Sequence, residues 1–177
     1  MLFQIVSLLV NTITGLLGGL LLLRFWMQAI RVRPPNTVGQ FTFTLTDWLV
    51  LPLRRVIAGV GGYDWASLVG AFLVSLVASL LYLLFGFPLA AVLVIALQNL
   101  AQSMIYGLML LLVVEVIFSW INPMAPAAPF VRALNYPLLR ALRRVLPPVG
   151  GLDLSCLVAL VLLQIASILV NKLFSLI

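Results

Sequence analysis

The chain has 177 residues, of which 64% are hydrophobic and only 8% are charged. A soluble domain carries about a quarter charged residues, so this composition excludes an ordinary soluble domain and predicts an all-α membrane protein. The net charge of +6 is explained by the retention of Lys and Arg on the cytoplasmic side of a membrane, and no nucleic-acid partner is expected. One cysteine and no histidine exclude an intramolecular disulfide, imidazole metal sites and Ser-His-Asp catalysis. We therefore expect no enzyme activity, no cofactor and no metal.

The first charge-free stretch, Leu2 to Leu23, has about the length needed to cross a hydrocarbon core of ~30 Å. It is expected to continue as a helix to near Val32, because Pro34 and Pro35 then end it. The stretch lacks the positive start and the cleavage site of a signal peptide. It is therefore interpreted as a retained transmembrane helix.

Three further crossings are expected, at Trp65–Phe85, at about Met104–Ile121 and at Leu154 to about Asn171. The long charge-free stretch that holds the second and third of the four crossings is broken at Gly86-Phe87-Pro88. After this break, Leu89 to Leu97 fits either an extension of the third helix or a separate interfacial helix on the outer side. The sequence leaves both alternatives open.

Most of the basic residues fall in the two long loops: Arg31, Arg33, Arg54, Arg55, Arg132, Arg140, Arg143 and Arg144. The positive-inside rule then places both loops in the cytoplasm and both termini outside. In the second loop, Asn135 to Leu146 predicts a short amphipathic helix with Asn135 as its N-cap. Such a helix can lie in the membrane interface, and Trp48 to Ile57 could do the same.

The two halves of the chain repeat one pattern. Leu53-Arg54-Arg55 and Gly61-Gly62-Tyr63-Asp64 recur, at a constant spacing, as Leu142-Arg143-Arg144 and Gly150-Gly151-Leu152-Asp153. Each unit has two crossings, so the two units share one orientation and are parallel repeats. We assign the first repeat to residues 1–86, an outer connector to 87–103 and the second repeat to 104–177.

These motifs resemble the YggT family of bacterial integral membrane proteins. The resemblance also includes Leu23-Arg24-Phe25 with Gln28, and Ser119-Trp120 with Asn122-Pro123. It implies a multi-pass protein of the bacterial inner membrane, in which the outer side predicted above for both termini is the periplasm. It also implies links to osmotic stress and potassium balance and, in relatives, to haem attachment in a b-type cytochrome or to cell division.

Asp64 and Asp153 each begin a crossing helix after a Gly-Gly turn. A carboxylate there can accept hydrogen bonds from the first-turn N–H groups and complement the positive end of the helix. Helix capping is the expected role. An ion pair with the arginine pair of the same loop is the alternative.

The loop arginines Arg54, Arg55, Arg140, Arg143 and Arg144 have two interpretations. One is topology and anchoring to the lipid bilayer. The other is a contact site for anionic lipid headgroups or for a membrane-protein partner, because a basic residue near an anionic leaflet contributes on the order of 1 kcal/mol.

Arg24 and Glu115 occupy matching places in the two repeats, when Arg24 and Gln28 are aligned with Glu115 and Ser119. An ionisable group within a membrane is a candidate functional site. We expect an ion pair between the two side chains across the interface of the repeats. A cation or proton site and lipid-exposed snorkelling are the alternatives.

Two classes of function remain. The first is a non-enzymatic scaffold or assembly factor that binds a membrane-protein partner or a second copy of itself. The second is a small protein of osmotic-stress response and cation homeostasis, although the crossings have few polar groups to line a pore. Gly15 and Gly19 have GxxxG spacing, for which close packing between helices is the default expectation.

Overall fold

The computed structural model describes residues 2–57, 59, 61–145 and 153–175. Every element in this part of the chain is helical. The elements are α1 (Leu2–Ile30), α2 (Asn36–Val56), α3 (Trp65–Ser79), the 3₁₀ helix η1 (Leu80–Phe85), α4 (Leu89–Ile121), α5 (Ala128–Val145) and α6 (Leu154–Phe174).

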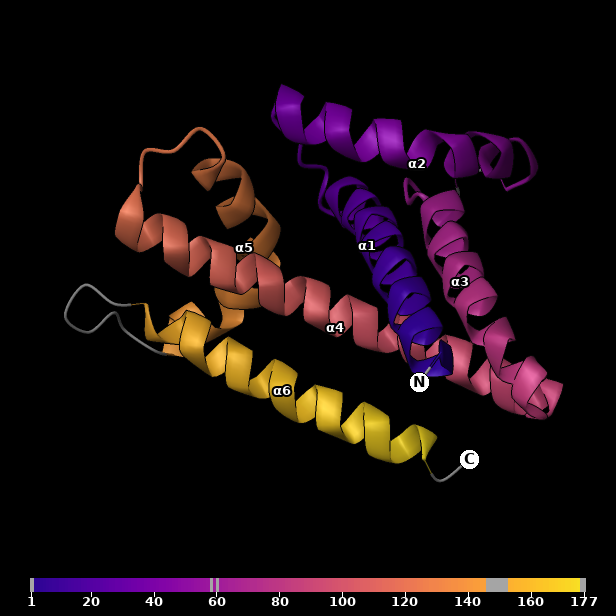
Figure 1. Ribbon diagram of the computed structural model, residues 1–177. Helices are drawn as coiled ribbons and strands as arrows, with labels where there is room; N and C mark the ends of the chain where they lie inside the picture. The colour runs from indigo at the N-terminus through magenta and orange to yellow at the C-terminus, as the bar shows by residue number, and fades with distance from the viewer. Residues whose placement is uncertain (1, 58, 60, 146–152, 176–177) are drawn as a thin grey trace.

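Four segments are long and apolar enough to cross a membrane: Ile5–Ile30, Trp65–Phe85, Leu89–Ile121 and Leu154–Phe174. They lie within α1, α3 with η1, α4 and α6, which confirms the predicted all-α membrane architecture. Figure 1 shows α2 lying across the end of α1 and α3, while α5 lies beside the C-terminal half of α4. The two loop helices therefore gather at the same end of the molecule.

The segment after Pro88 is the N-terminal part of α4, which runs without a break from Leu89 to Ile121. Of the two alternatives for Leu89 to Leu97, the structure thus has the extension. Most of the predicted connector, 87–103, belongs to this helix. The second crossing ends differently from the prediction of one continuous helix, because Leu80 to Phe85 tighten into a 3₁₀ turn.

Both loop helices are longer than predicted. The helix predicted from Trp48 already begins at Asn36. The helix predicted from Asn135 begins at Ala128, so Asn135 is not an N-cap but a buried residue in the interior of α5. Leu146, the predicted end of this helix, and the repeated pair Gly150-Gly151 lie outside the described residues.

Each repeat has its own apolar core. Leu21, Val50 and Ala71 join α1, α2 and α3 in the first repeat. Leu112, Leu139 and Ala159 join the equivalent helices α4, α5 and α6 in the second. The order of contacts is thus the same in both halves, as expected for a repeated unit.

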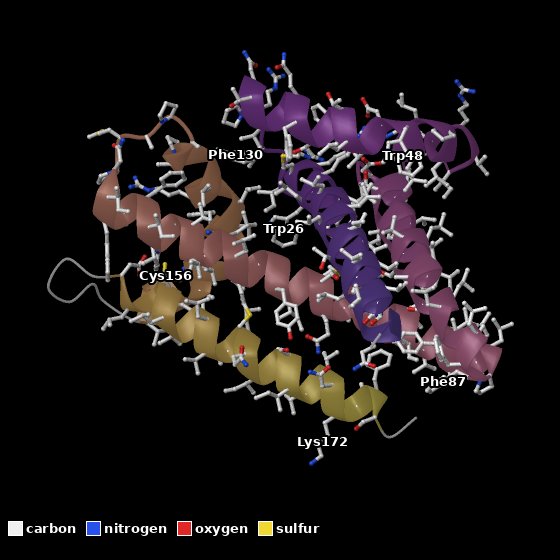
Figure 2. The ribbon with its side chains drawn as sticks, viewed as in Figure 1. Trp26, Trp48, Phe87, Phe130, Cys156 and Lys172 are labelled. Atoms are coloured by element: carbon white, nitrogen blue, oxygen red, sulfur yellow. The ribbon has the colours of Figure 1, made fainter. Side chains whose placement is uncertain are left out.

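A third cluster joins the repeats where the end of α1 meets α5, and it contains Met27, Phe130 and Leu134. Trp26 points from α1 toward this cluster (Figure 2), and its Nε1 donates a hydrogen bond to the Leu134 carbonyl oxygen at 3.1 Å. The repeats are therefore in contact near the loop helices.

Polar side chains join α4 to α6 toward the opposite end. Gln102 Nε2 donates to the Ser167 carbonyl oxygen at 2.9 Å and to Asn171 Oδ1 at 2.8 Å. Ser167 Oγ donates to Gln102 Oε1 at 2.8 Å. These amide groups satisfy one another, as buried polar groups in a membrane protein must.

Candidate functional site

Asp64 is the centre of a charge network in the first repeat. It precedes α3 as its N-cap and accepts a hydrogen bond from the Ser67 backbone N–H, which confirms the predicted capping role. The same carboxylate also makes the ion pair that was the alternative, because Arg54 Nη2 lies 2.6 Å from Asp64 Oδ2. Ser67 Oγ also donates a hydrogen bond to Asp64 Oδ2 at 2.6 Å. Positive φ angles at Gly61 and Gly62 turn the chain into this cap.

Arg24 enters this network from α1 and is only 5% exposed. Its Nη1 donates to Thr46 Oγ1 at 2.9 Å and to Asp47 Oδ1 at 2.6 Å, both on α2. Its Nε lies 3.5 Å from Asp64 Oδ2, and its guanidinium stacks over Phe43, 4.9 Å from the ring centre. Arg24 therefore ties α1 to α2 and to the start of α3.

Arg143 is the centre of the equivalent network in the second repeat. Its Nη2 lies 2.8 Å from Glu115 Oε1 and 2.6 Å from Asp153 Oδ2. Asn135 Nδ2 donates to Glu115 Oε2 at 2.7 Å, and Asp153 caps α6 by accepting from the Ser155 N–H at 3.0 Å. The capping prediction for Asp153 is thus confirmed as well.

The expected ion pair between Arg24 and Glu115 was wrong. Arg24 pairs with Asp47 and Asp64, and Glu115 pairs with Arg143. The physical reason is that each repeat brings opposite charges from its own loop helix to the buried group. Matching positions in two repeats indicate equal depth, but they do not indicate that the two side chains face each other.

The two networks share one Arg–Asp pair at equivalent positions, Arg54–Asp64 and Arg143–Asp153, and differ in the sign of the residue from the first helix of each repeat, Arg24 or Glu115. In the first, the carboxylate of Asp64 lies between the two guanidinium groups of Arg24 and Arg54. In the second, the guanidinium group of Arg143 lies between two carboxylates. Thr46 and Asn135 occupy equivalent positions of the repeat, and each donates or accepts a hydrogen bond with the buried charge.

The charge partners shift the pKa values of the capping carboxylates in one direction. Burial acts to raise the pKa of Asp64, but hydrogen bonds from Arg54 and Ser67 outweigh it and hold the pKa below its usual value. Asp153 behaves likewise through Arg143. In turn, the hydrogen bond to Asp64 raises the pKa of Arg54. Both carboxylates are therefore ionised at neutral pH.

The five predicted loop arginines separate into two groups. Arg54 and Arg143 turn inward to the capping carboxylates. Arg55, Arg140 and Arg144 are exposed and make no ion pair with a carboxylate of the described chain. The contributions of Thr46, Asp47 and Asn135 were missed by the sequence interpretation, although the equivalent positions of Thr46 and Asn135 in the repeat were a usable signal.

Two cavities accompany the networks. A cavity of about 410 Å³ lies between α1 and α2 and is lined by charged and apolar groups, Arg24, Gln28, Asp47 and Arg54 among them. A second, almost wholly apolar cavity of about 580 Å³ lies between α1 and α4, with residues of α2 at its edge. No group of three metal-ligating His, Cys, Asp or Glu side chains occurs in the described ranges.

Gly15 and Gly19 line the apolar cavity together with Gly107 of α4. A Cβ atom added to any of these three glycines would meet no other atom within 4 Å. The expected close packing at Gly15 and Gly19 is therefore not made by the residues that the structure describes. The glycines instead widen the space between the two repeats.

Comparison with known proteins identifies relatives over nearly the whole chain. An uncharacterised protein of Pseudomonas aeruginosa is 36% identical over 172 residues, covering 92% of this chain and 86% of the relative. The uncharacterised protein YggT of Escherichia coli is 32% identical over 158 residues, covering 89% and 84%. No solved structure gives a significant match. The CCB3/YggT family matches residues 3–85 and 94–174, as two tandem segments. The chain therefore belongs to the CCB3/YggT family of proteins.

Proposed function

We propose that this protein is a non-enzymatic scaffold of the bacterial inner membrane, which holds a transmembrane helix of a partner protein between its two repeats. The observation that carries the proposal is the apolar cavity of about 580 Å³ between α1 and α4. The described part of the chain leaves this space open, whereas clusters of buried apolar residues fill the interior of each repeat.

The lining of the cavity supports a helix as the bound group. Three glycines, Gly15, Gly19 and Gly107, present open backbone to it. Small residues let the backbones of two membrane helices approach closely, where van der Waals packing drives association. Leu16 and Leu110 flank the glycines and are more than half exposed, so they offer apolar contacts to the same partner.

The charge networks give the scaffold its rigidity. Arg24 joins α1 to α2, and Arg54 joins α2 to α3. Arg143 makes the matching connections among α4, α5 and α6. In this proposal the loop helices lie at the cytoplasmic interface, where exposed Arg55, Arg140 and Arg144 bind anionic headgroups.

Site-specific photo-cross-linking tests the scaffold proposal. A photoreactive residue at Leu110, in the cavity, should yield a discrete protein adduct in native membranes. The matched control is Leu169 on α6, which has similar exposure and does not line the cavity. Protein adducts should disappear when Gly15→Leu and Gly19→Leu fill the space. Only lipid adducts at Leu110, or equal protein adducts at both positions, would contradict the proposal.

A role in cation homeostasis is a second candidate, favoured by the network around Glu115. Two carboxylates there contact one guanidinium nitrogen, which leaves an excess negative charge beside a buried acidic group. Ion flux in proteoliposomes tests this role, with Glu115→Gln as the comparison. Flux that is absent, or that Glu115→Gln leaves unchanged, would count against it.

A further inference from the structure

The cavity between α1 and α2 combines a charged wall with an apolar wall. The charged wall consists of Arg24, Gln28, Asp47 and Arg54, and the apolar wall consists of Met27, Val32, Pro34, Phe43 and Leu51. The two walls meet where the Arg24 guanidinium lies over the Phe43 ring. Its volume of about 410 Å³ falls in the ~300–1,000 Å³ range of small-molecule sites. The cavity is separate from the apolar space between the repeats, because the two cavities share no lining residue.

The charged wall has hydrogen-bond donors to spare. Arg24 bonds through Nη1, and Arg54 bonds through Nε and Nη2. Among the described residues, no hydrogen bond uses Arg24 Nη2 or Arg54 Nη1. The buried Arg24 Nε makes no hydrogen bond but lies 3.5 Å from Asp64 Oδ2, so it is not one of the spare donors. Arginine donors suit the oxygens of a phosphate group, which they bind through charge-assisted hydrogen bonds.

The charge balance of the cavity restricts the class of ligand that can bind there. Arg24 and Arg54 are already offset by Asp47 and Asp64, which contact them directly. A purely anionic ligand would therefore leave excess negative charge in a partly buried site, which is costly. A zwitterion keeps the balance, since its phosphate can contact the guanidinium groups while its ammonium contacts Asp47. The Asp47 side chain is 40% exposed, so it remains accessible.

The apolar wall favours a phospholipid over a soluble phosphate compound as the ligand. Phe43 and Leu51 are exposed side chains of α2 that line the cavity beside the charges. A free phosphate compound would gain nothing from them. A phospholipid, however, would place its glycerol and the first methylenes of its acyl chains there.

We propose that this cavity binds the phosphoethanolamine-type headgroup of a zwitterionic phospholipid, with its phosphate on Arg24 and Arg54 and its ammonium on Asp47. This site is distinct from the exposed arginines, which attract anionic lipid without a cavity. It is also independent of the partner cavity between the repeats, so either proposal can fail without the other.

The site is tested by measuring, with native mass spectrometry, how tightly short-chain lipids bind to the full chain in detergent. Phosphatidylethanolamine should bind at least about tenfold more tightly than phosphatidylglycerol, the factor for about 1.4 kcal/mol. Leu51→Trp, which fills the cavity without removing a charge, should abolish this preference. Val56→Trp is the matched control, because Val56 lies on the same helix, is 85% exposed and does not line the cavity.

Asp47→Asn tests the contact to the ammonium group separately from the contact to the phosphate. It should remove the preference for phosphatidylethanolamine, because the ammonium contact is lost, while binding of phosphatidylglycerol is retained, because the charge of Arg24 is then no longer offset by Asp47 and still attracts the phosphate. Inorganic phosphate and free phosphoethanolamine are the probes for a soluble ligand, and both should bind far more weakly than the lipid. Equal binding of both lipids by the wild type, equal effects of Leu51→Trp and Val56→Trp, or soluble probes that match the lipid would each overturn the proposal.

Discussion

Glu115 on α4 and Arg143 on α5 form an ion pair of 2.8 Å in the second repeat. The first repeat builds its buried ion pair with the signs exchanged between the helices, because Arg24 comes from the first crossing helix and Asp47 from the loop helix. Asp47 lies at a different position of the repeat from Arg143, whose equivalent is Arg54. One framework of helices thus accommodates either sign of buried charge, provided that the partner comes from the same repeat.

Removing the partner of Glu115 should destabilise the protein more than removing an exposed arginine. Arg143→Gln leaves Glu115, which is 5% exposed, without its cation, and breaking such a pair costs about 3–5 kcal/mol when both groups are buried. Because Arg143 is partly exposed, we expect about 2 kcal/mol, seen as a lowered Tm in detergent. Arg144→Gln is the control and should change stability by less than about 0.5 kcal/mol.

The double variant with Glu115→Gln and Arg143→Gln tests whether the pair is the cause. It should be more stable than the sum of the two single losses predicts, because neither charge is left unpaired. Strict additivity of the two losses would contradict a direct interaction.

Reversing both Arg24 and Glu115 should not rescue either single reversal. Each side chain pairs within its own repeat, so Arg24→Glu meets Asp47 and Asp64, while Glu115→Arg meets Arg143. The measured quantities are the amount of folded protein in membranes and its Tm. Recovery in the double variant to near the wild-type level would show that the two groups interact across the repeats after all.

Acid should weaken the first network through Asp64. Its pKa is lower in the folded protein than in the unfolded chain, so its stabilising contribution is present above the unfolded value near 4 and is lost as the pH falls through the folded value. The wild type should therefore lose Tm on acidification below about pH 4. Asp64→Asn should start with a lower Tm and show a shallower loss, whereas a parallel decline in both proteins would exclude this role of Asp64.

Gln102 should contribute to the contact between α4 and α6. Gln102→Ala removes the hydrogen bonds to Ser167 and Asn171, and a hydrogen bond between membrane helices contributes about 0.6 kcal/mol on average. A total loss of about 1 kcal/mol is expected in unfolding from mixed micelles. Gln98→Ala is the control, because Gln98 makes one exposed hydrogen bond, to Asn171. A loss of stability in Gln98→Ala that equals or exceeds the loss in Gln102→Ala would contradict the larger contribution expected of Gln102.

The membrane sidedness is tested by reporters fused to the C-terminus. Because the arginines gather in the two loops, we expect both loops in the cytoplasm and the C-terminus outside. A reporter that is active only in the periplasm should therefore be active when it is fused to the C-terminus. Activity of a reporter that functions only in the cytoplasm would reverse the topology.

The crossing helices and the caps could be predicted because they depend on local sequence. Charge-free stretches set the positions of α1, α3, α4 and α6, and a carboxylate after two glycines identified Asp64 and Asp153. The start of α2 could not be found in this way, since Thr42, Thr46 and their neighbours have only moderate helix propensity. Their burial against the rest of the repeat stabilises this helix, and such tertiary contacts leave no local pattern.

The partners of Arg24 and Glu115 illustrate the same limit. Position in the repeat indicated the depth of both side chains but carried no information on their direction around the helix. Asp47 was also assigned to a segment interpreted as part of a loop. Once that segment is a helix, Thr46 and Asp47 reach Arg24, and the network follows.

The length of α4 has a consequence for how the two repeats respond to their surroundings. Its 33 residues span about 50 Å at 1.5 Å per residue, whereas a bilayer core is ~30 Å thick. A helix of this length must tilt steeply or extend beyond the hydrocarbon, and Figure 1 shows α4 running obliquely past α1. α4 contacts α1 and α3 of the first repeat as well as α5 and α6 of the second, so a change in its tilt in a thinner bilayer acts on the helices of both repeats. Membrane thickness therefore reaches both halves of the protein through this one helix.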